Sequence, residues 1–539
     1  MGVVPVEFNR EALFASGALT LGELVAQLPG VTMMTTGFIM APQVLAWHGD
    51  PRGVRLFVDG IEREEVMPRN AGIADFALVP LWSLEQVTLE SSPGELRVHA
   101  RTWRVDHTTP STRVDVLTGS ENLNLFRGYF GKRSANGIAI EIAAQQANTA
   151  SATGMDGDGL GAFVRLGWAR RSWSIDLTTL RQGLNRNAGV RNPTGVAVPN
   201  AFPAFDGSTS MTYLRAGWRD PQQVTGPWLQ MVAATMGAVK THPTKSSVSS
   251  NSLIPADTSD TTASRAQYAF SGGVNRAGLR LSGAARFHSA DGKLDAAPSV
   301  RGEWTRDWIS VSANAGRRFE GTAVWDVRGT LVPRDWLRIS GSVGVSQSGP
   351  DSGKATRSGQ RVEAAVRWRD RWLSVGTIRL SGGVVSAPIE LDTAMRAVVV
   401  PDGTGIVASF TGPLLRGWSA STDIVKWNGA VSYRPSTQAR TKIWFSSTFN
   451  DRFPQANFHL LAAFTHDYRS QFYVPLGDDP VGQTSKPSSV IGSLVEIRIA
   501  SAIISWSYRN TSGTYYETFP GYLMPRITSV YGIRWEFWN

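Results

Sequence analysis

The strand pattern of this chain is clearest in Trp304-Thr-Arg-Asp-Trp-Ile-Ser-Val-Ser-Ala-Asn-Ala-Gly316. From Ile309 onward an apolar residue alternates with a small polar one, so that Ile309 and Val311 share one face of a strand and Ser310 lies on the other. A soluble β-sandwich and a membrane β-barrel both contain strands with one apolar and one polar face. The choice between them therefore depends on the surrounding sequence.

The alternating pattern recurs through most of the chain, as in Leu279–Phe287 and Val362–Trp368. Trp304, Trp336 and Trp368 stand 32 residues apart, each beside a charged turn. Tryptophan in this position is typical of the aromatic girdle of a membrane barrel, where the indole packs at the interface and its N–H stays in water. Core positions would be the alternative in a soluble protein.

The connections between the predicted strands largely alternate between short and long. We expect short connections at Lys132–Asn136, Ala169–Ser172, Asp220–Gly226, Asn275–Ala277, Thr305–Asp307, Pro333–Asp335, Trp368–Arg371, Pro435–Thr437, Asp467–Ser470 and Ala500–Ala502. We expect long ones at Leu184–Ser208, Thr241–Thr261, Gln347–Ser358, Gly383–Leu415 and Leu476–Ser488. Ten short turns make ten hairpins, and one further strand at each end gives 22. The sequence therefore predicts an all-β transmembrane β-barrel of about 22 antiparallel strands over residues 109–539.

Residues 1–108 follow a different pattern and are predicted to form a small α/β domain. Thr20-Leu-Gly-Glu23 has the spacing of a capping box, and apolar residues follow at helical spacing until Pro29-Gly30 ends the helix. Val54–Val58 is β-prone, and Asp59-Gly60 directly after it is a strong turn signal. These signals predict a short amphipathic helix and a hairpin.

This N-terminal segment resembles the plug domain of TonB-dependent outer-membrane receptors. Thr20–Val31 is similar to the family's helix ending in Pro-Gly-Val, and Val54–Ile61 is similar to its strand ending in Asp-Gly-Val. Leu81–Ser91 is similar to the segment around the family's Val-Glu-Val strand. The resemblance implies that residues 1–108 lie in the barrel lumen, with plug-motif residues at Pro29, Gly30, Asp59 and Gly60.

The C-terminus is similar to the last strand of outer-membrane barrels. In Val530–Phe537, the residues Gly532, Trp535 and Phe537 stand where the signal read by the barrel-assembly machinery has its glycine and two aromatics. Trp538 and Asn539 extend past the usual terminal aromatic. The resemblance thus extends over nearly the whole chain.

Three features depart from the family pattern. His48-Gly49 stands in place of the family's Arg-Gly, and the Gly-Pro-rich stretch after the Val-Glu-Val strand is shortened to Ser92-Pro-Gly-Glu95, so the plug is expected to be trimmed. The best match to a TonB box is Val4-Pro5-Val6, which the resemblance makes the contact for a TonB-like energy-transducing protein of the inner membrane. Because this match is weak, it argues against energised transport more than it argues against the fold.

Composition excludes several kinds of chemistry. With no Cys, the chain has no disulfide, thiolate metal site or cysteine nucleophile. The net charge of +10 comes mainly from arginines spread singly along the predicted strands, which indicates a solvated strand face and no nucleic-acid site. The histidines lack metal-ligand spacing, and neither a Gly-x-Ser-x-Gly elbow nor a P-loop occurs. We predict no enzyme activity, no metal and no cofactor.

The resulting prediction is ligand uptake through a plugged barrel in the bacterial cell outer membrane. Its expected partners are outer-membrane lipid, a TonB-like protein if transport is energised, and the barrel-assembly machinery. The alternative is a plugged barrel that does not transport but anchors or caps a larger outer-membrane assembly with other proteins. The sequence does not identify the ligand or the residues that bind it.

Overall fold

The structure is a computed structural model of the chain. It describes residues 5–538 apart from 64–72, 151–155, 188, 192–197, 203–204, 220–224, 242–260, 291, 320, 349–354, 389–390, 392–394, 456 and 477–482. No helix among the described residues is both long and apolar enough to cross a bilayer.

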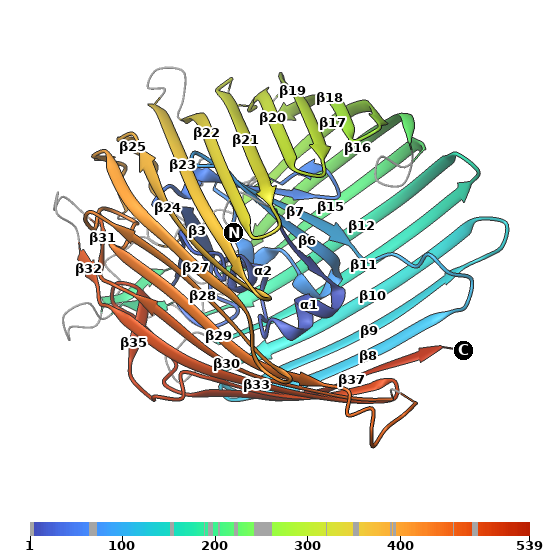
Figure 1. Cartoon of the computed structure of the whole chain (residues 1–539). Helices are drawn as coiled ribbons and strands as arrows, with labels where there is room; N and C mark the ends of the chain where they lie inside the picture. Colours follow the sequence, from blue (N-terminus) through green and yellow to red (C-terminus); the bar gives the residue numbers. More distant parts are fainter. Residues whose placement is uncertain are drawn as a thin grey trace.

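Within the described part of the chain, 22 antiparallel strands form a closed barrel. The barrel surrounds the N-terminal part of the chain (Figure 1). In chain order they are β8 (Ser111–Gly119), β9 (Leu123–Arg133), β10 (Ile138–Thr149), β11 (Gly157–Arg170), β12 (Trp173–Arg186), β15 (Phe205–Trp218), β16 (Gly226–Thr241), β17 (Thr261–Arg276), β18 (Leu279–Ala290), β19 (Lys293–Arg306), β20 (Ile309–Arg317), β21 (Ala323–Arg334), β22 (Leu337–Ser348), β23 (Ala355–Trp368), β24 (Arg371–Leu380), β27 (Gly403–Leu415), β28 (Trp418–Trp427), β29 (Thr437–Ser447), β30 (Phe458–Arg469), β33 (Ser488–Ile499), β34 (Ala502–Arg509) and β37 (Thr528–Trp538). The ring closes where β37 pairs with β8, with Val530 opposite Gly119. The predicted barrel and its strand number are confirmed.

The strand register places apolar side chains outside and polar ones in the lumen. In β20, Ile309 is paired with Leu331, an exposed leucine of β21. Asn314 lies on the other face and donates to the buried carboxylate of Asp326, 3.2 Å away. Because side chains alternate along a strand, Ser310 shares the lumen face with Asn314. The predicted assignment of faces is therefore correct.

Two of the predicted short turns are wrong. One end of the barrel, the turn end, carries connections 134–137, 171–172, 219–225, 277–278, 307–308, 335–336, 369–370, 416–417, 448–457 and 500–501. Thr437 and Arg469 instead lie at the opposite end, the loop end, and the predicted loop Gly383–Leu415 contains β27. Glycines and Pro413 interrupt the alternation in β27, and the ten-residue turn 448–457 has the length of a loop. The turns at 416–417 and 448–457 were not predicted, and the two turns predicted at Pro435–Thr437 and Asp467–Ser470 lie at the other end of the barrel. The two kinds of error cancel, so the predicted number of strands is still correct.

The plug contains a five-stranded sheet in the order β1-β6-β7-β4-β5. Its elements are β1 (Val6–Asn9), α1 (Arg10–Ala15), α2 (Leu21–Val25), β2 (Val31–Thr35), β3 (Gln43–Trp47), β4 (Val54–Val58), β5 (Ile61–Glu62), β6 (Leu84–Ser91) and β7 (Leu96–Thr102), with 3-10 turns at Pro51–Gly53, Phe76–Leu78 and Leu81–Ser83. Strand β4 runs parallel to β7, and the other pairs are antiparallel. The predicted helix and hairpin are both present. The predicted domain boundary after residue 108 falls between β7 and β8.

The core of the plug is continuous with the barrel wall. Leu24, Val87 and Val98 of the plug belong to one buried apolar cluster with Phe163 and Tyr213 of the barrel. The plug and the barrel wall therefore share one apolar core on this side. Polar contacts attach the rest of the plug surface to the wall.

Among the residues that the structure describes in the loop-end connections, four two-stranded sheets are present. They are β13 (Gly189–Arg191) with β14 (Val198–Phe202), β25 (Gly383–Val385) with β26 (Val398–Val400), β31 (Phe472–Val474) with β32 (Gln483–Ser485), and β35 (Tyr516–Phe519) with β36 (Tyr522–Met524). Val385, Phe472 and Phe519 from three of these sheets join a buried apolar cluster with Met34 and Val44 of the plug. Loop-end segments thus cover part of the plug.

Candidate functional site

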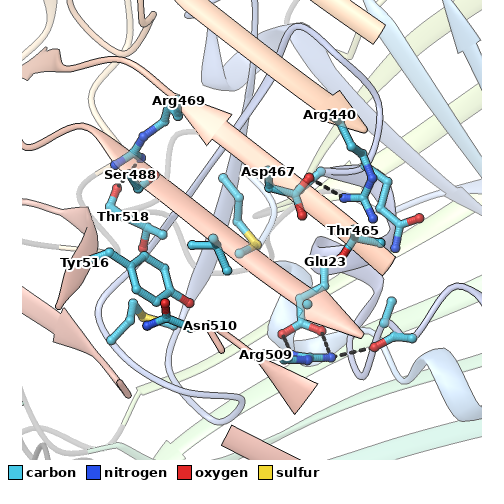
Figure 2. Close-up of a pocket in the computed structure, with 18 of the residues that line it drawn as sticks. Glu23, Arg440, Thr465, Asp467, Arg469, Ser488, Arg509, Asn510, Tyr516 and Thr518 are labelled. Carbon is cyan, nitrogen blue, oxygen red and sulfur yellow. Dashed lines mark hydrogen bonds and ion pairs between the residues drawn. The ribbon is translucent and has the colours of Figure 1, made fainter. Parts of the chain in front are cut away.

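A cavity of about 290 Å³ lies between the plug and the barrel wall. Its plug side is formed by α2, by β2 and by the segments that flank them. Its wall side is formed by β29, β30, β33 and β34, and residues of the connection between β34 and β37 also line it. Figure 2 shows that charged side chains from the plug and the wall point toward one another across this space.

Glu23 and Arg509 form the ion pair that joins the two sides of the cavity (Figure 2). Thr20 caps α2 by accepting a hydrogen bond from the Glu23 N–H at 3.2 Å. The Glu23 carboxylate accepts from both terminal nitrogens of Arg509, at 2.6 and 2.9 Å, and Arg509 also donates to the Gly17 carbonyl. Bidentate pairs of this kind fix geometry as well as charge. The predicted capping box differs in one detail, since Glu23 accepts from Leu19 N–H and not from that of Thr20.

A second ion pair lies on the wall of the cavity. Arg440 and Asp467 are directly opposite each other on β29 and β30, with Nη1 and Oδ1 3.0 Å apart. Their side chains are 21% and 43% exposed, so this pair contributes only about 0–1 kcal/mol to stability. Because solvent already screens the pair, either partner can turn to a ligand at little energetic cost.

The loop-end side of the cavity is held by Arg469 and Tyr516. Arg469 donates to the Glu517 carbonyl at 2.6 Å and to the Ser485 hydroxyl at 3.0 Å, which ties two loop-end segments to β30. Burial raises the pKa of Tyr516 to about 12, so its phenol is neutral and remains a hydrogen-bond donor in ordinary conditions. Asn510 is oriented by its bond to the Thr514 carbonyl.

These groups suit non-covalent binding of a polar ligand. They offer the guanidinium groups of Arg440, Arg469 and Arg509, the carboxylates of Glu23 and Asp467, and the Tyr516 phenol around one space. Within the described part of the chain, no three His, Cys, Asp or Glu side chains are grouped so that they could hold a metal ion.

The Asp59-Gly60 turn latches the other side of the plug to the barrel. Both residues have positive φ, 51° and 82°, as a type I′ hairpin turn requires. The Asp59 carboxylate is paired with Arg165 at 3.3 Å and accepts a hydrogen bond from the Tyr213 hydroxyl. Burial by itself would raise the pKa of Asp59, but Arg215 and Arg165 hold it well below its usual range.

A second set of buried ion pairs attaches β6 and β7 to the same side of the barrel. Glu90 accepts from Arg301 at 2.7 Å and from Arg328 at 3.3 Å. Glu95 accepts from Arg318 at 2.6 Å, and Arg97 is paired with Asp326.

These partners correct the interpretation of the strand arginines as solvated. Arg165 of β11 and Arg328 of β21 are buried in the lumen against the plug carboxylates of Asp59 and Glu90. The signal in the sequence was the single arginine on the polar face of a strand, but local sequence does not show which face receives a plug.

The plug-motif residues predicted by resemblance lie at turns of the plug. Gly30 has a φ of 93°, and its carbonyl accepts from the His48 N–H at 2.9 Å. A Cβ on Gly30 would meet the His48 ring, so this turn requires glycine. Pro29 lines the cavity described above, whereas Asp59 belongs to the latch on the other side. The structure therefore does not bring the motif residues together in one site.

The predicted energy-transducer contact lies at the start of the described chain. Val4 falls outside the described residues, Pro5 precedes the first strand, and Val6 is paired with Leu89 in the plug sheet.

The predicted assembly-signal residues all lie in β37. Gly532 is opposite Leu117 of β8, and a Cβ there would collide with the Val116 carbonyl. Trp535 and Phe537 lie two residues apart, with their ring centroids 4.6 Å from each other.

Comparison with known proteins gives the fold and little sequence similarity. No protein-family model matches the chain, and no curated protein matches it. A ferric enterobactin receptor mutant from Pseudomonas aeruginosa matches with a TM-score of 0.73 at 10% identity, covering 99% of this chain and 98% of that one. The siderophore receptor PirA from Acinetobacter baumannii matches with a TM-score of 0.72 at 10% identity, covering 99% and 98%. The FrpB iron transporter from Neisseria meningitidis matches with a TM-score of 0.73 at 10% identity, covering 99% and 100%. The chain has the fold of these proteins, plug and barrel together.

Proposed function

We propose that this chain is an outer-membrane protein, similar to TonB-dependent receptors, that binds a ligand and takes it up through the plugged barrel. The observation that carries the proposal is the charged cavity between α2 and the β29–β34 part of the wall. It lies where a solute entering the lumen would meet the plug, and its side chains can recognise polar groups. The proteins that share the fold are named as receptors and a transporter, which favours uptake over the alternative of a non-transporting anchor.

The exterior of the barrel supports placement in a membrane. Large apolar side chains such as Val300, Val362 and Leu373 are more than half exposed on the outer face. Trp336 and Trp368 are 53% and 63% exposed beside turns at the same end of the barrel. Exposed apolar surface on this scale is unfavourable in water, and a band of it bordered by tryptophan is typical of lipid contact. We place the turn end in the periplasm and the loop end outside the cell.

The ligand class is proposed from the neighbours and from the cavity. Ferric siderophores are the first candidates, because neighbouring structures are named as enterobactin and siderophore receptors. Arg440 and Arg509 could contact anionic oxygens of such a ligand, while Glu23 and Asp467 would contact its donor groups.

Two protein partners are also proposed. A TonB-like protein would act on Val4, Pro5 and Val6. Val6 is paired with Leu89 in the plug sheet, so this pairing must break before a TonB-like protein can bind Val6. A force applied to this segment would therefore act directly on the plug sheet. The barrel-assembly machinery would read Gly532, Trp535 and Phe537 on β37.

The test is uptake of radioactive iron from a panel of ferric siderophores by cells that lack their own receptors and express this chain. Arg509→Met should lower uptake, because it removes the bidentate partner of Glu23 and one cation of the cavity. The matched control is Arg367→Met, which makes the same change at an exposed pair of the turn end. Uptake that is absent for every siderophore, together with a stoichiometric partner on purification, would contradict the proposal and support the anchor.

A further inference from the structure

A second cavity, of about 580 Å³, lies at the turn end of the barrel. It is bounded by α1 of the plug and by lumen-facing residues of β30, β33, β34 and β37. Arg498 and Glu496 of β33 line it, as do Arg534 of β37 and Ser501 in a two-residue turn at this end.

The two cavities follow each other along the same strands. On β33, Gly492 and Leu494 line the first cavity and Glu496 lines the second. On β30, Thr465 lines the first and Leu461 the second, which leaves Ala463 between them. Since successive lumen-facing residues are two positions apart, the cavities adjoin directly on β33, whereas on β30 the single residue Ala463 separates them.

On the plug side, the end of α1 lies between the two cavities. Ala15 lines the second cavity, and its neighbour Ser16 lines the first. Lys442 of β29 donates to the Ala15 carbonyl at 3.4 Å, and a Cβ placed on Gly17 would lie 4.0 Å from the Leu494 side chain. Gly17 has a φ of 71°, which favours glycine at this bend. Arg509 also donates to the Gly17 carbonyl at 2.6 Å, so hydrogen bonds from two wall side chains hold this bend.

The plug is attached unequally to its two sides. The sheet side has buried pairs, among them Asp59 with Arg165 and Glu95 with Arg318. On the α1 side, the Glu11–Arg498 pair is solvent-exposed. Buried pairs are costly to break, whereas an exposed pair contributes about 0–1 kcal/mol. The Glu23–Arg509 pair on the same wall is only partly exposed, so the α1 end of this wall, held by the exposed pair, is the part that yields first.

We propose that solute crosses this protein along the β29–β30–β33–β34 wall, through the two cavities in turn, and that residues 15–17 of the plug form the barrier between them. This inference rests on the proposed function and gives it a route. Arginines and carboxylates occur in similar numbers along both cavities, so the route suits polar solutes of either charge.

The test uses potassium and chloride ions as the probe, in planar bilayers containing the full-length protein. Lys442→Ala with Leu494→Ala removes two of the wall side chains at the barrier, and we expect stepwise conductance that the unmodified protein lacks. The control is Arg361→Ala with Ile378→Ala, a lumen-facing cation and aliphatic residue paired on β23 and β24, away from both cavities. We expect no steps from this control.

A third substitution tests the route itself. Ala463 lies opposite Leu494 between the two cavities, so adding Ala463→Trp to the first double variant should refill the gap and abolish the steps. Heat-modifiable migration on gels verifies that each variant is a folded barrel. Folded barrels that stay closed after the first double substitution, or equal steps from the control pair, would overturn the inference.

The conductance experiment needs no ligand, so its failure is separable from that of the proposed function. Steps that behave as expected without any uptake would retain the route and contradict the proposed function. Normal siderophore uptake with no steps would retain the function and contradict the route.

Discussion

Arginine substitutions on the outer face should have a cost that depends on depth in the membrane. Strand β19 has 14 residues, and at about 3.3 Å per residue with a tilt of about 40° it covers roughly 35 Å along the barrel axis. Val300 is near its centre and 58% exposed, so Val300→Arg should place a charge near the bilayer midplane and cost about 2–4 kcal/mol. Ile309 begins β20 beside a turn, so Ile309→Arg should cost only about 0–1 kcal/mol.

The measurement is equilibrium unfolding in denaturant of barrels refolded into phospholipid vesicles, followed by tryptophan fluorescence. Ser310→Arg is the lumen control, because Ser310 lies next to Ile309 but faces the polar interior. We expect it to cost no more than Ile309→Arg. Equal costs for Val300→Arg and Ile309→Arg would refute the reasoning, because a charge in lipid must become more costly with depth.

Four further predictions follow from the contacts of the plug and of the last strand. Asp59→Asn should destabilise the plug–barrel latch by about 3–5 kcal/mol, seen as faster proteolysis of the plug, whereas the exposed Asp335→Asn should not. Because the pKa of Asp59 is lowered in the folded protein, the stabilisation that its carboxylate gives to the plug–barrel latch is fully present above the ordinary pKa of Asp and is lost as the pH falls through the lowered pKa. When resistance of the plug to proteolysis is followed during acid titration, this stabilisation should be lost only well below pH 4. Gly532→Ala should reduce barrel assembly, measured by heat-modifiable migration, while Gly128→Ala, where a Cβ meets open space, should not; equal yields would contradict the steric argument. A Gly94→Cys/Ser346→Cys disulfide, whose Cβ atoms would be 3.3 Å apart, should leave iron uptake intact because it ties only the sheet side, and lost uptake would show that this side moves too.

The local features of the plug could be predicted because they depend on neighbours in sequence. The Thr20 cap and the Asp59-Gly60 turn are determined by side chains and φ angles within four residues, and both are present. The arrangement of barrel faces was also predictable, since lipid outside and polar lumen inside impose period two on strands such as β20. The turns at 416–417 and 448–457 were missed because glycine in β27 and a long turn sequence obscure that period.

The candidate site could not be predicted, because its residues meet only through tertiary structure. Arg509 and Glu23 are 486 positions apart, and their pairing requires closure of the barrel around the plug. Nothing in the sequence near Arg328 or Arg318 shows that their partners are Glu90 and Glu95. A barrel of alternating strands and a small α/β plug were predictable from the residues alone, because both follow from local geometry and from burial on one face. Which arginines pair with the plug, and where the plug leaves space beside the wall, was decided only by the packing of one domain inside the other.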